Sequence, residues 1–84
     1  MKKTILNILL EQRKGTSVTV QKILTEWGCI IKTRIGLHAG VLDDCTETGL
    51  IILELVGEKE KHEQLNMLLA NLPGVKTELV VLEL

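Results

Sequence analysis

Apolar and polar residues alternate along the chain in segments whose periodicity predicts four strands. Residues 4–12 form a short run rich in Ile and Leu, and residues 29–38 alternate between apolar and polar side chains. Residues 49–57 are apolar on both faces, and residues 75–84 form a last apolar run. Alternation predicts a half-buried strand, and a short continuous apolar run bounded by turn residues predicts a buried one. The charged positions of 29–38 favour the edge of a sheet.

Two further segments carry apolar residues at the i, i+3, i+4, i+7 spacing of an amphipathic helix. The first covers residues 17–27, with Thr16 or Ser17 as N-cap and Gly28 as the left-handed stop. The second covers residues 59–72 and ends at Pro73 and Gly74. The apolar stripes of the two helices consist of Val20, Ile23, Leu24 and Trp27, and of Leu65, Leu68, Leu69 and Leu72.

The order strand, helix, strand, strand, helix, strand predicts one domain over residues 1–84 with a ferredoxin-like βαββαβ fold. Right-handed crossovers place both helices on one face of a four-stranded antiparallel sheet, with the first and third strands central. On that covered face we expect Leu6, Ile8, Leu10, Ile31, Ile35, Leu37, Ile51, Leu53, Leu55, Val75, Leu79 and Val81.

The opposite face of the predicted sheet is also aliphatic. An apolar surface of this kind marks a site of association, so we expect a homodimer or a higher homo-oligomer. Glu54 is predicted on this face, beside Arg34 of the neighbouring strand and Asn7. The expected interface consists of Ile5, Leu9, Leu50, Ile52, Glu54, Val56, Val80 and Leu82.

Composition narrows the choice of partner. The chain has no Phe or Tyr and a single Trp, and its formal net charge is −1. RNA-binding modules of this topology stack bases on aromatic residues of the central strands, so direct nucleic-acid binding is not expected. The charge is uneven, because residues 1–42 hold seven Lys or Arg against two acids, whereas 43–84 hold nine acids against three Lys.

The two cysteines, Cys29 and Cys45, do not have C-x-x-C spacing, and they predict a reduced, cytoplasmic protein. The first twelve residues are basic and then apolar, but Asn7 and Glu11 interrupt the run, which argues against an export signal. No segment approaches the roughly 18 apolar residues of a membrane span. We therefore expect no membrane partner.

Three short motifs connect the sequence to a known family. They are Arg34-Ile35-Gly36, the strand opening Gly49-Leu50-Ile51, and the turn Leu72-Pro73-Gly74-Val75-Lys76. With them, nearly the whole chain resembles the iron-only hydrogenase system regulators, an ACT-like family similar in fold to the ligand-binding domain of the nickel-responsive repressor. The resemblance implies a stand-alone ACT-like regulatory domain that oligomerises through its sheet. The alternative is a purely structural oligomer or protein-interaction module without a ligand.

In ACT domains, the end of the first strand and the start of the first helix carry an acidic residue and a glycine at the effector site. Glu11 and Gly15 stand at these positions, and Lys14 stands where proline is expected. The resemblance thus implies a small-molecule effector near Glu11, Gly15 and Thr16. Independently, a glycine before a helix N-terminus can hold an anion, although an ordinary turn and N-cap are the commoner explanation of residues 14–17.

Arg34, Gly36 and His38 form a second candidate ligand site. A glycine in a strand permits close approach of a ligand, and a charged edge strand with a glycine bulge has the same pattern. His38 and Cys45 are also potential metal ligands, completed by Asp43, Asp44 or the partner subunit's His62. No paired motif supports a metal or a cofactor, and His62 is equally a flank of the first turn of its helix. No nucleophile motif is present, so an enzyme is not expected.

Overall fold

The computed structural model describes residues 1–11, 14–38 and 48–84 of the chain. Four strands and two α-helices follow one another in the predicted βαββαβ order. The first half consists of β1 (Lys2–Glu11), α1 (Lys14–Glu26), a 3₁₀ turn (Gly28–Ile30) and β2 (Ile31–His38). The second half consists of β3 (Thr48–Leu55), α2 (Lys59–Ala70) and β4 (Val75–Glu83). Among the described helices, none combines the length and apolarity needed to cross a membrane.

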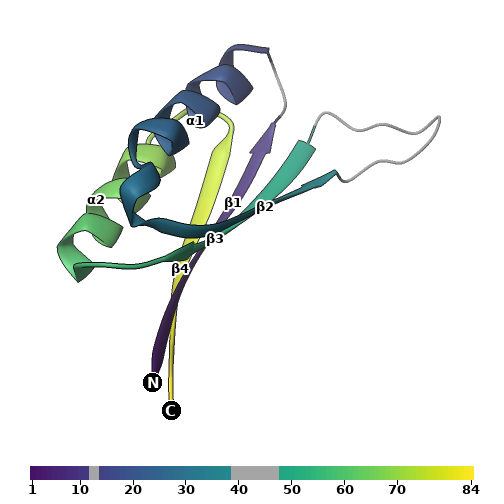
Figure 1. Cartoon of the computed structure of the whole chain (residues 1–84). Helices are drawn as coiled ribbons and strands as arrows, with labels where there is room; N and C mark the ends of the chain where they lie inside the picture. The colour runs from purple at the N-terminus through teal and green to yellow at the C-terminus, as the bar shows by residue number, and fades with distance from the viewer. Residues whose placement is uncertain (12–13, 39–47) are drawn as a thin grey trace.

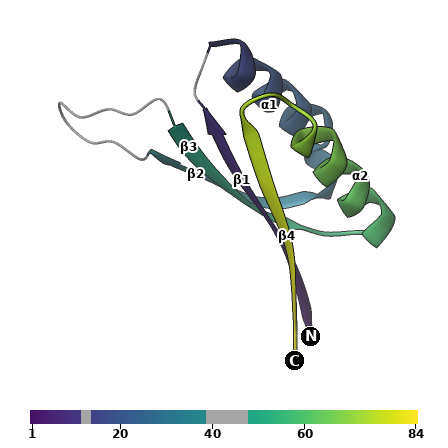
Figure 2. The same ribbon diagram turned by 180° about the vertical axis from the view of Figure 1, so that it is seen from behind.

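The strands form one antiparallel sheet in the order β2-β3-β1-β4. Both helices lie on the same face of this sheet (Figure 1), and the other face carries no helix (Figure 2). The two central strands are β1 and β3, as predicted. The chain termini lie side by side, since the N–H of Leu84 donates to the carbonyl of Met1 at 2.9 Å.

A continuous aliphatic core lies between the helices and the sheet. Alternate residues of β1 and β3 face the helices because side chains along a strand point to opposite faces. Leu6 lies opposite Leu53, and Ile8 lies opposite Ile51. Trp27 packs against this core, as predicted. The buried apolar residues are Leu6, Ile8, Leu10, Val20, Ile23, Leu24, Ile51, Leu53, Leu55, Leu65, Leu69 and Val75.

The edge strand β2 contains an irregularity that the alternation of residues 29–38 did not predict. Ile31 lies opposite Leu55, but Thr33 lies opposite the next residue of β3, Glu54. Two steps on β2 therefore match one step on β3, which is the definition of a β-bulge. From Thr33 onward, each β2 residue lies on the face opposite to the predicted one.

The bulge corrects three predicted positions. Ile35 lies opposite Ile52, and Leu37 lies opposite Leu50, so both belong to the uncovered face rather than to the core face. Arg34 lies opposite Leu53 on the helix side, where it is exposed at the sheet edge. The prediction that Arg34 and Glu54 share a face was therefore wrong. The predicted bulge at Gly36 is also wrong, because the irregularity lies between Ile31 and Thr33.

The ends of α1 differ from prediction, whereas α2 begins at Lys59 as predicted and ends at Ala70, two residues before the predicted end. Helix α1 already begins at Lys14, so Thr16 and Ser17 lie within it and not at its N-cap. Gly28 does not adopt a positive φ but starts the 3₁₀ turn. Gly74 has φ +74° and reverses the chain between α2 and β4, as the Pro73-Gly74 pair indicated.

Candidate functional site

Glu11 and Gly74 meet at the end of the molecule where β1 passes into α1. The backbone N–H of Glu11 donates to the carbonyl of Gly74 at 3.0 Å. A Cβ atom added at Gly74 would lie 3.1 Å from Oε2 of Glu11, so the carboxylate lies directly against the turn. The structure thus brings the predicted acidic residue beside the segment that joins α2 to β4.

Two hollows flank Leu72 at this end. One, of about 320 Å³, is lined by Gly15, Thr16, Thr19, Leu72 and Pro73. The other, of about 480 Å³, includes Glu11 in its lining together with Leu72, Gly74 and Lys76. The hydroxyl of Thr19 donates its proton to the carbonyl of Gly15 at 2.9 Å, so this proton is already used within the helix. The predicted effector residues Glu11, Gly15 and Thr16 are therefore gathered around two adjoining hollows.

The second predicted group, on β2, is not gathered in the same way. Gly36 lies opposite Ile51 and His38 opposite Gly49, while Arg34 lies exposed on the helix side. A Cβ atom at Gly36 would have no neighbour within 4 Å among the described residues, so no close approach requires this glycine. The predicted partners Asp43, Asp44 and Cys45 lie outside the described residues.

His62 does not have the position predicted for it. It was expected on the flank of the first turn of α2, but only 5 % of its surface is exposed. Its Nε2 lies 2.8 Å from the carbonyl oxygen of Val56. The spacing of His62, Leu65 and Leu69 on the helix was a signal for this burial. Within the described part of the chain, no three His, Cys, Asp or Glu residues are close enough to hold a metal.

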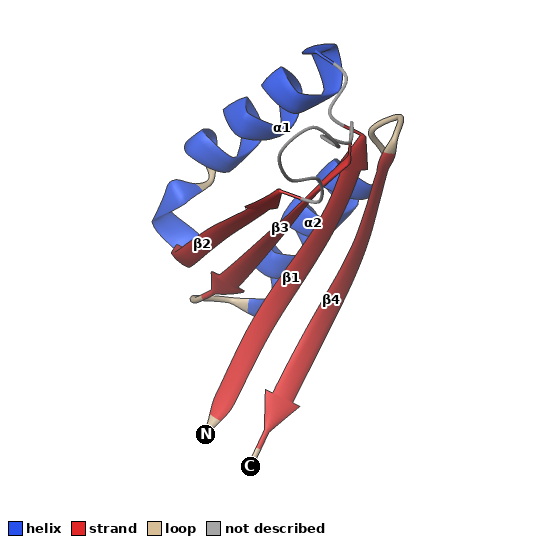
Figure 3. Cartoon of the chain, turned by 90° about the vertical axis from the view of Figure 1, so that its right-hand side faces the viewer, coloured by secondary structure: helices blue, strands red, loops and turns tan. Residues whose placement is uncertain are grey.

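The predicted interface residues lie on the uncovered sheet face. In the strand register, Ile5 lies opposite both Glu54 and Val80, and Leu9 lies opposite Leu50. Asn7 lies opposite Ile52 on the same face, as expected. Val56 follows the last residue of β3 and is exposed. Figure 3 shows that β1 and β4 extend beyond the two other strands toward the termini.

Exposure varies across this face, because Ile5, Leu50, Ile52 and Val80 are partly buried and other apolar residues are exposed. The exposed fractions are 51 % for Leu9, 47 % for Ile35 and 60 % for Leu82. Ile35 was not among the predicted interface residues, and the bulge in β2 is what adds it. The uncovered face is thus more aliphatic on the β2 side than the sequence indicated.

Lys3, rather than Arg34, is the ion-pair partner of Glu54. Its Nζ lies 3.1 Å from Oε2 of Glu54. Hydrogen bonding from Lys3 is the main cause that lowers the pKa of Glu54 from its ordinary value of 4.5, and desolvation partly opposes this. The charges of Lys3 and Lys32 and a hydrogen bond from Thr33 lower the pKa further.

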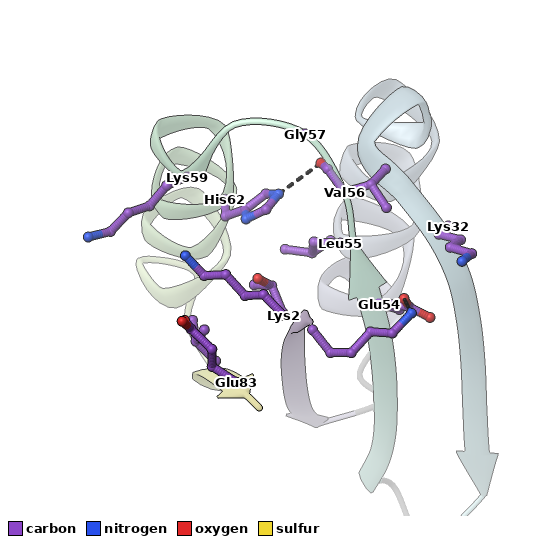
Figure 4. A pocket seen from close by; sticks show the side chains of 12 residues that line it. Lys2, Lys32, Glu54, Leu55, Val56, Gly57, Lys59, His62 and Glu83 are labelled. Carbon is purple, nitrogen blue, oxygen red and sulfur yellow. Dashed lines mark hydrogen bonds and ion pairs between the residues drawn. The ribbon is translucent and has the colours of Figure 1, made fainter.

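A third hollow was not indicated by any sequence motif. It has a volume of about 560 Å³ and lies where β3 passes into α2, at the opposite end of β1 from Glu11. Lysines from three elements and the buried His62 line it (Figure 4). These residues are distant in sequence, so only the fold brings them together.

The fold, with Glu11 and Gly15 at the β1-α1 end, resembles known structures. No protein-family model and no curated protein sequence matches the chain. An uncharacterized protein from Thermotoga maritima superimposes with a TM-score of 0.84 and 25 % identity, over 99 % of this chain and 100 % of that one. The ACT domain of a GTP pyrophosphokinase from Chlorobium tepidum gives 0.68 and 18 %, over 95 % and 97 %.

This chain has the ACT-type ferredoxin-like fold. A PII-like nitrogen regulatory protein from Thiomonas intermedia shares it, with a TM-score of 0.65 and 13 % identity over 98 % of this chain and 90 % of that one. The predicted fold class is therefore confirmed. Because the identities to the GTP pyrophosphokinase domain and to the PII-like protein are low, these two similarities concern the fold alone.

Proposed function

We propose that the chain is a non-catalytic ACT-type regulatory domain that self-associates through the uncovered sheet face and binds a small effector near Glu11, Gly15 and Thr16. The observation that carries this proposal is the pair of hollows around those three residues. They join the end of β1, the first turn of α1 and the turn before β4.

The chemistry of the two hollows suits a small polar molecule. The first N–H groups of a helix have no partner within the helix, and α1 begins beside Gly15 and Thr16. An anionic group of the effector is favoured there, because the helix dipole is positive at its N-terminus. Lys76 and Glu11 border the second hollow and supply charges of both signs.

Self-association is supported by the uncovered face. A domain of this size buries only about 60 to 65 % of the surface of its unfolded chain, so further burial against a second copy contributes substantially to stability. Leu9, Ile35 and Leu82 are about half exposed on that face. A second copy of the chain carries the same apolar face, so the two faces can cover each other.

The regulatory context comes from similarity alone. The motifs at residues 34–36, 49–51 and 72–76 resemble the iron-only hydrogenase system regulators, which supports a role in hydrogenase-related regulation. A PII-like protein from Thiomonas intermedia, similar at a TM-score of 0.58 and 14 % identity, is bound to ADP, AMP and bicarbonate. Adenine nucleotides therefore belong among the ligands to be tested.

A scaffold without a ligand is the second candidate. It is favoured by apolar side chains on the outer surfaces of the helices, where no core is available to them. Val18 on α1 and Met67 on α2 are both 64 % exposed. Such a module would bind protein partners on the helix side and a second copy on the sheet side.

A thermal-shift screen tests the effector proposal. Amino acids, adenine nucleotides and divalent metal salts are added to the purified protein, since a ligand selective for the folded state raises its melting temperature. At a hundredfold excess over Kd the gain is about 2.7 kcal/mol, which is a rise of roughly 10 °C or more for a domain of this size.

Two glycine variants locate the effector. Gly15→Leu places a side chain at the first hollow, whereas Gly28→Leu is a matched control away from it. At neither position would an added Cβ have a neighbour within 4 Å among the described residues. The ligand-induced shift should disappear in G15L and persist in G28L. A screen without any shift would instead favour the scaffold.

A further inference from the structure

The cavity at the end of β3 combines buried polar groups with a rim of lysines. It is far from Glu11 and Gly15, which lie at the other end of β1 and at the start of α1 (Figure 1). Its volume of about 560 Å³ falls within the roughly 300 to 1,000 Å³ of small-molecule sites. The effector site proposed above does not include it.

His62 is held at this cavity in a fixed orientation. Because a carbonyl oxygen accepts, the Nε2 of His62 carries a proton and donates it to Val56 at 2.8 Å (Figure 4). Among the residues that the structure describes, the second ring nitrogen, Nδ1, has no hydrogen-bond partner. A buried imidazole with one committed and one uncommitted nitrogen is prepared to contact a ligand.

Thr4 is a second buried polar side chain at the same cavity. Only 8 % of its surface is exposed, and it lies opposite Leu55 and Val81 in the sheet. Within the described residues, its hydroxyl forms no hydrogen bond. Among the described side chains, the buried atom without a hydrogen-bond partner is Asn66 Oδ1, so the Thr4 hydroxyl is open to the solvent of the hollow. Thr4 and His62 therefore place two uncommitted polar atoms around one hollow.

The charge around the cavity is positive. Lys2, Lys3, Lys32 and Lys59 line it against Glu54 and Glu83, so the formal charges give an excess of two positive charges. Lys3 is committed to Glu54. Figure 4 shows Lys2 extending from β1 toward α2 beneath His62. Three of these four lysines come from the basic N-terminal half of the sequence, although the whole chain has a net charge of −1.

One wall of the cavity is apolar. Leu55 and Val56 at the end of β3 and Val81 of β4 contribute it. A water molecule accounts for about 30 Å³ of liquid volume, and a phosphate group is not many times larger. It therefore occupies only a small part of the cavity of about 560 Å³. The remaining space can hold an organic moiety against the aliphatic wall.

We propose that this cavity binds a small organic molecule that carries a phosphate group. A phosphate monoester has a charge of about −1.5 to −2 at pH 7, which matches the excess of positive charge. Lys2 supplies a mobile point charge, as lysines do in phosphate sites, and the Thr4 hydroxyl donates a hydrogen bond to a phosphate oxygen. The Nδ1 of His62 carries no proton when Nε2 does, so it accepts a hydrogen bond from a hydroxyl of the organic part. The organic part contacts Leu55, Val56 and Val81.

The test is an NMR titration of the ¹⁵N-labelled protein with inorganic phosphate, ribose 5-phosphate and ribose. At about 10 mM, probes with a Kd in the millimolar range produce measurable shifts. The backbone amides of Thr4, Gly57 and His62 should move with both phosphate probes and not with ribose, and ribose 5-phosphate should bind more tightly than inorganic phosphate.

Two sets of variants distinguish a built site from general attraction to lysines. K2Q/K59Q removes two charges at the cavity, and K22Q/K61Q removes two exposed charges that do not line it. The Kd should rise about tenfold or more in the first and change less than about twofold in the second. Thr4→Val, which leaves the charge unchanged, should weaken binding severalfold.

Several outcomes would overturn the proposal. Absence of shifts at these amides with both phosphate probes would do so, as would equal weakening in the two double variants. Selective shifts with magnesium or calcium chloride instead would assign the cavity to a cation held by Glu54 and Glu83. Because G15L leaves this cavity intact, loss of effector binding in that variant without loss of phosphate binding separates the two proposals.

Discussion

The Nζ of Lys3 lies 3.1 Å from Oε2 of Glu54 across two neighbouring central strands. Lys3 precedes Ile5 by two positions, and Ile5 is the direct neighbour of Glu54, so the pair is diagonal on the uncovered face. This ion pair shares the uncovered face with the aliphatic residues and with Asn7, Lys76 and Glu78. Arg34, which the alternation of residues 29–38 placed there, lies on the other face.

Removing Lys3 should raise the pKa of Glu54 toward 4.5, because the hydrogen bond from Lys3 is the largest cause of its lowered value. A group with a lowered folded-state pKa contributes stability above its unfolded pKa and loses it as pH falls through the folded value. Unfolding below about pH 4.5 should therefore depend less steeply on pH in Lys3→Gln than in the unmodified protein.

The measurement is a carboxyl-detected NMR titration of Glu54, with urea unfolding at several pH values. Lys2→Gln is the control, because Lys2 lies on the same face of β1 as the buried Thr4 and is not a cause of the lowered pKa. An unchanged Glu54 titration in Lys3→Gln would contradict the ion pair.

Placing a charge on the uncovered face should dissociate the oligomer. Ile52 lies between Asn7 and Ile35 in the middle of that face. Ile52→Lys would bury an unpaired charge in the interface, which is strongly unfavourable. Light scattering should show a reduced mass for Ile52→Lys and for Val80→Lys. Val18→Lys, on the helix side, should keep the mass of the unmodified protein, and a monomeric unmodified protein at micromolar concentration would refute self-association.

Gly74 and Gly36 should respond in opposite ways to a methyl group. Gly74→Ala combines a φ of +74° with a Cβ only 3.1 Å from Glu11 Oε2, so it should lower the free energy of unfolding by about 1 to 3 kcal/mol. Gly36→Ala meets no described neighbour within 4 Å and should change it by less than about 0.5 kcal/mol. Urea unfolding of both variants checks this, and equal losses would show that Gly36 has a conformational role.

Asn66 should be replaceable with a gain in stability. Its Oδ1 is buried and has no hydrogen-bond partner among the described residues. Asn66→Leu removes this uncompensated acceptor, so the free energy of unfolding should rise by about 1 kcal/mol.

Asn71→Leu is the matched comparison at the C-cap of the same helix. The Nδ2 of Asn71 donates to the carbonyl of Met67 at 2.7 Å, and its loss should cost about 0.5 to 1.5 kcal/mol. A loss of stability in Asn66→Leu would mean that Oδ1 is paired in solution.

Periodicity was sufficient for the number, type and order of the elements. Strand and helix periods differ, and α2 ends at Ala70, within two residues of the end expected from Pro73 and Gly74. It failed where one residue changes the register, since a bulge at the start of β2 reverses the faces of Thr33, Arg34 and Ile35. Exposed edge strands tolerate both arrangements, so their sequence specifies register weakly.

The candidate sites also differ in whether the sequence could predict them. Glu11, Gly15 and Thr16 were predicted because they are close in sequence and stand at a strand-to-helix junction. The cavity around Thr4, Lys2 and His62 was not predicted, because its residues come from both ends of the chain. No spacing of residues within one segment indicates that β1 and α2 both line this cavity.

The sequence by itself determined the βαββαβ order, the aliphatic core and the presence of a second apolar face, because each follows from the local period of hydrophobic residues. The tertiary structure decided which charges meet. It pairs Lys3 with Glu54, turns Arg34 to the helix side, and buries His62 against the carbonyl of Val56. These outcomes depend on strand register and on the docking of α2, and both are set by packing over the whole domain rather than by any one segment.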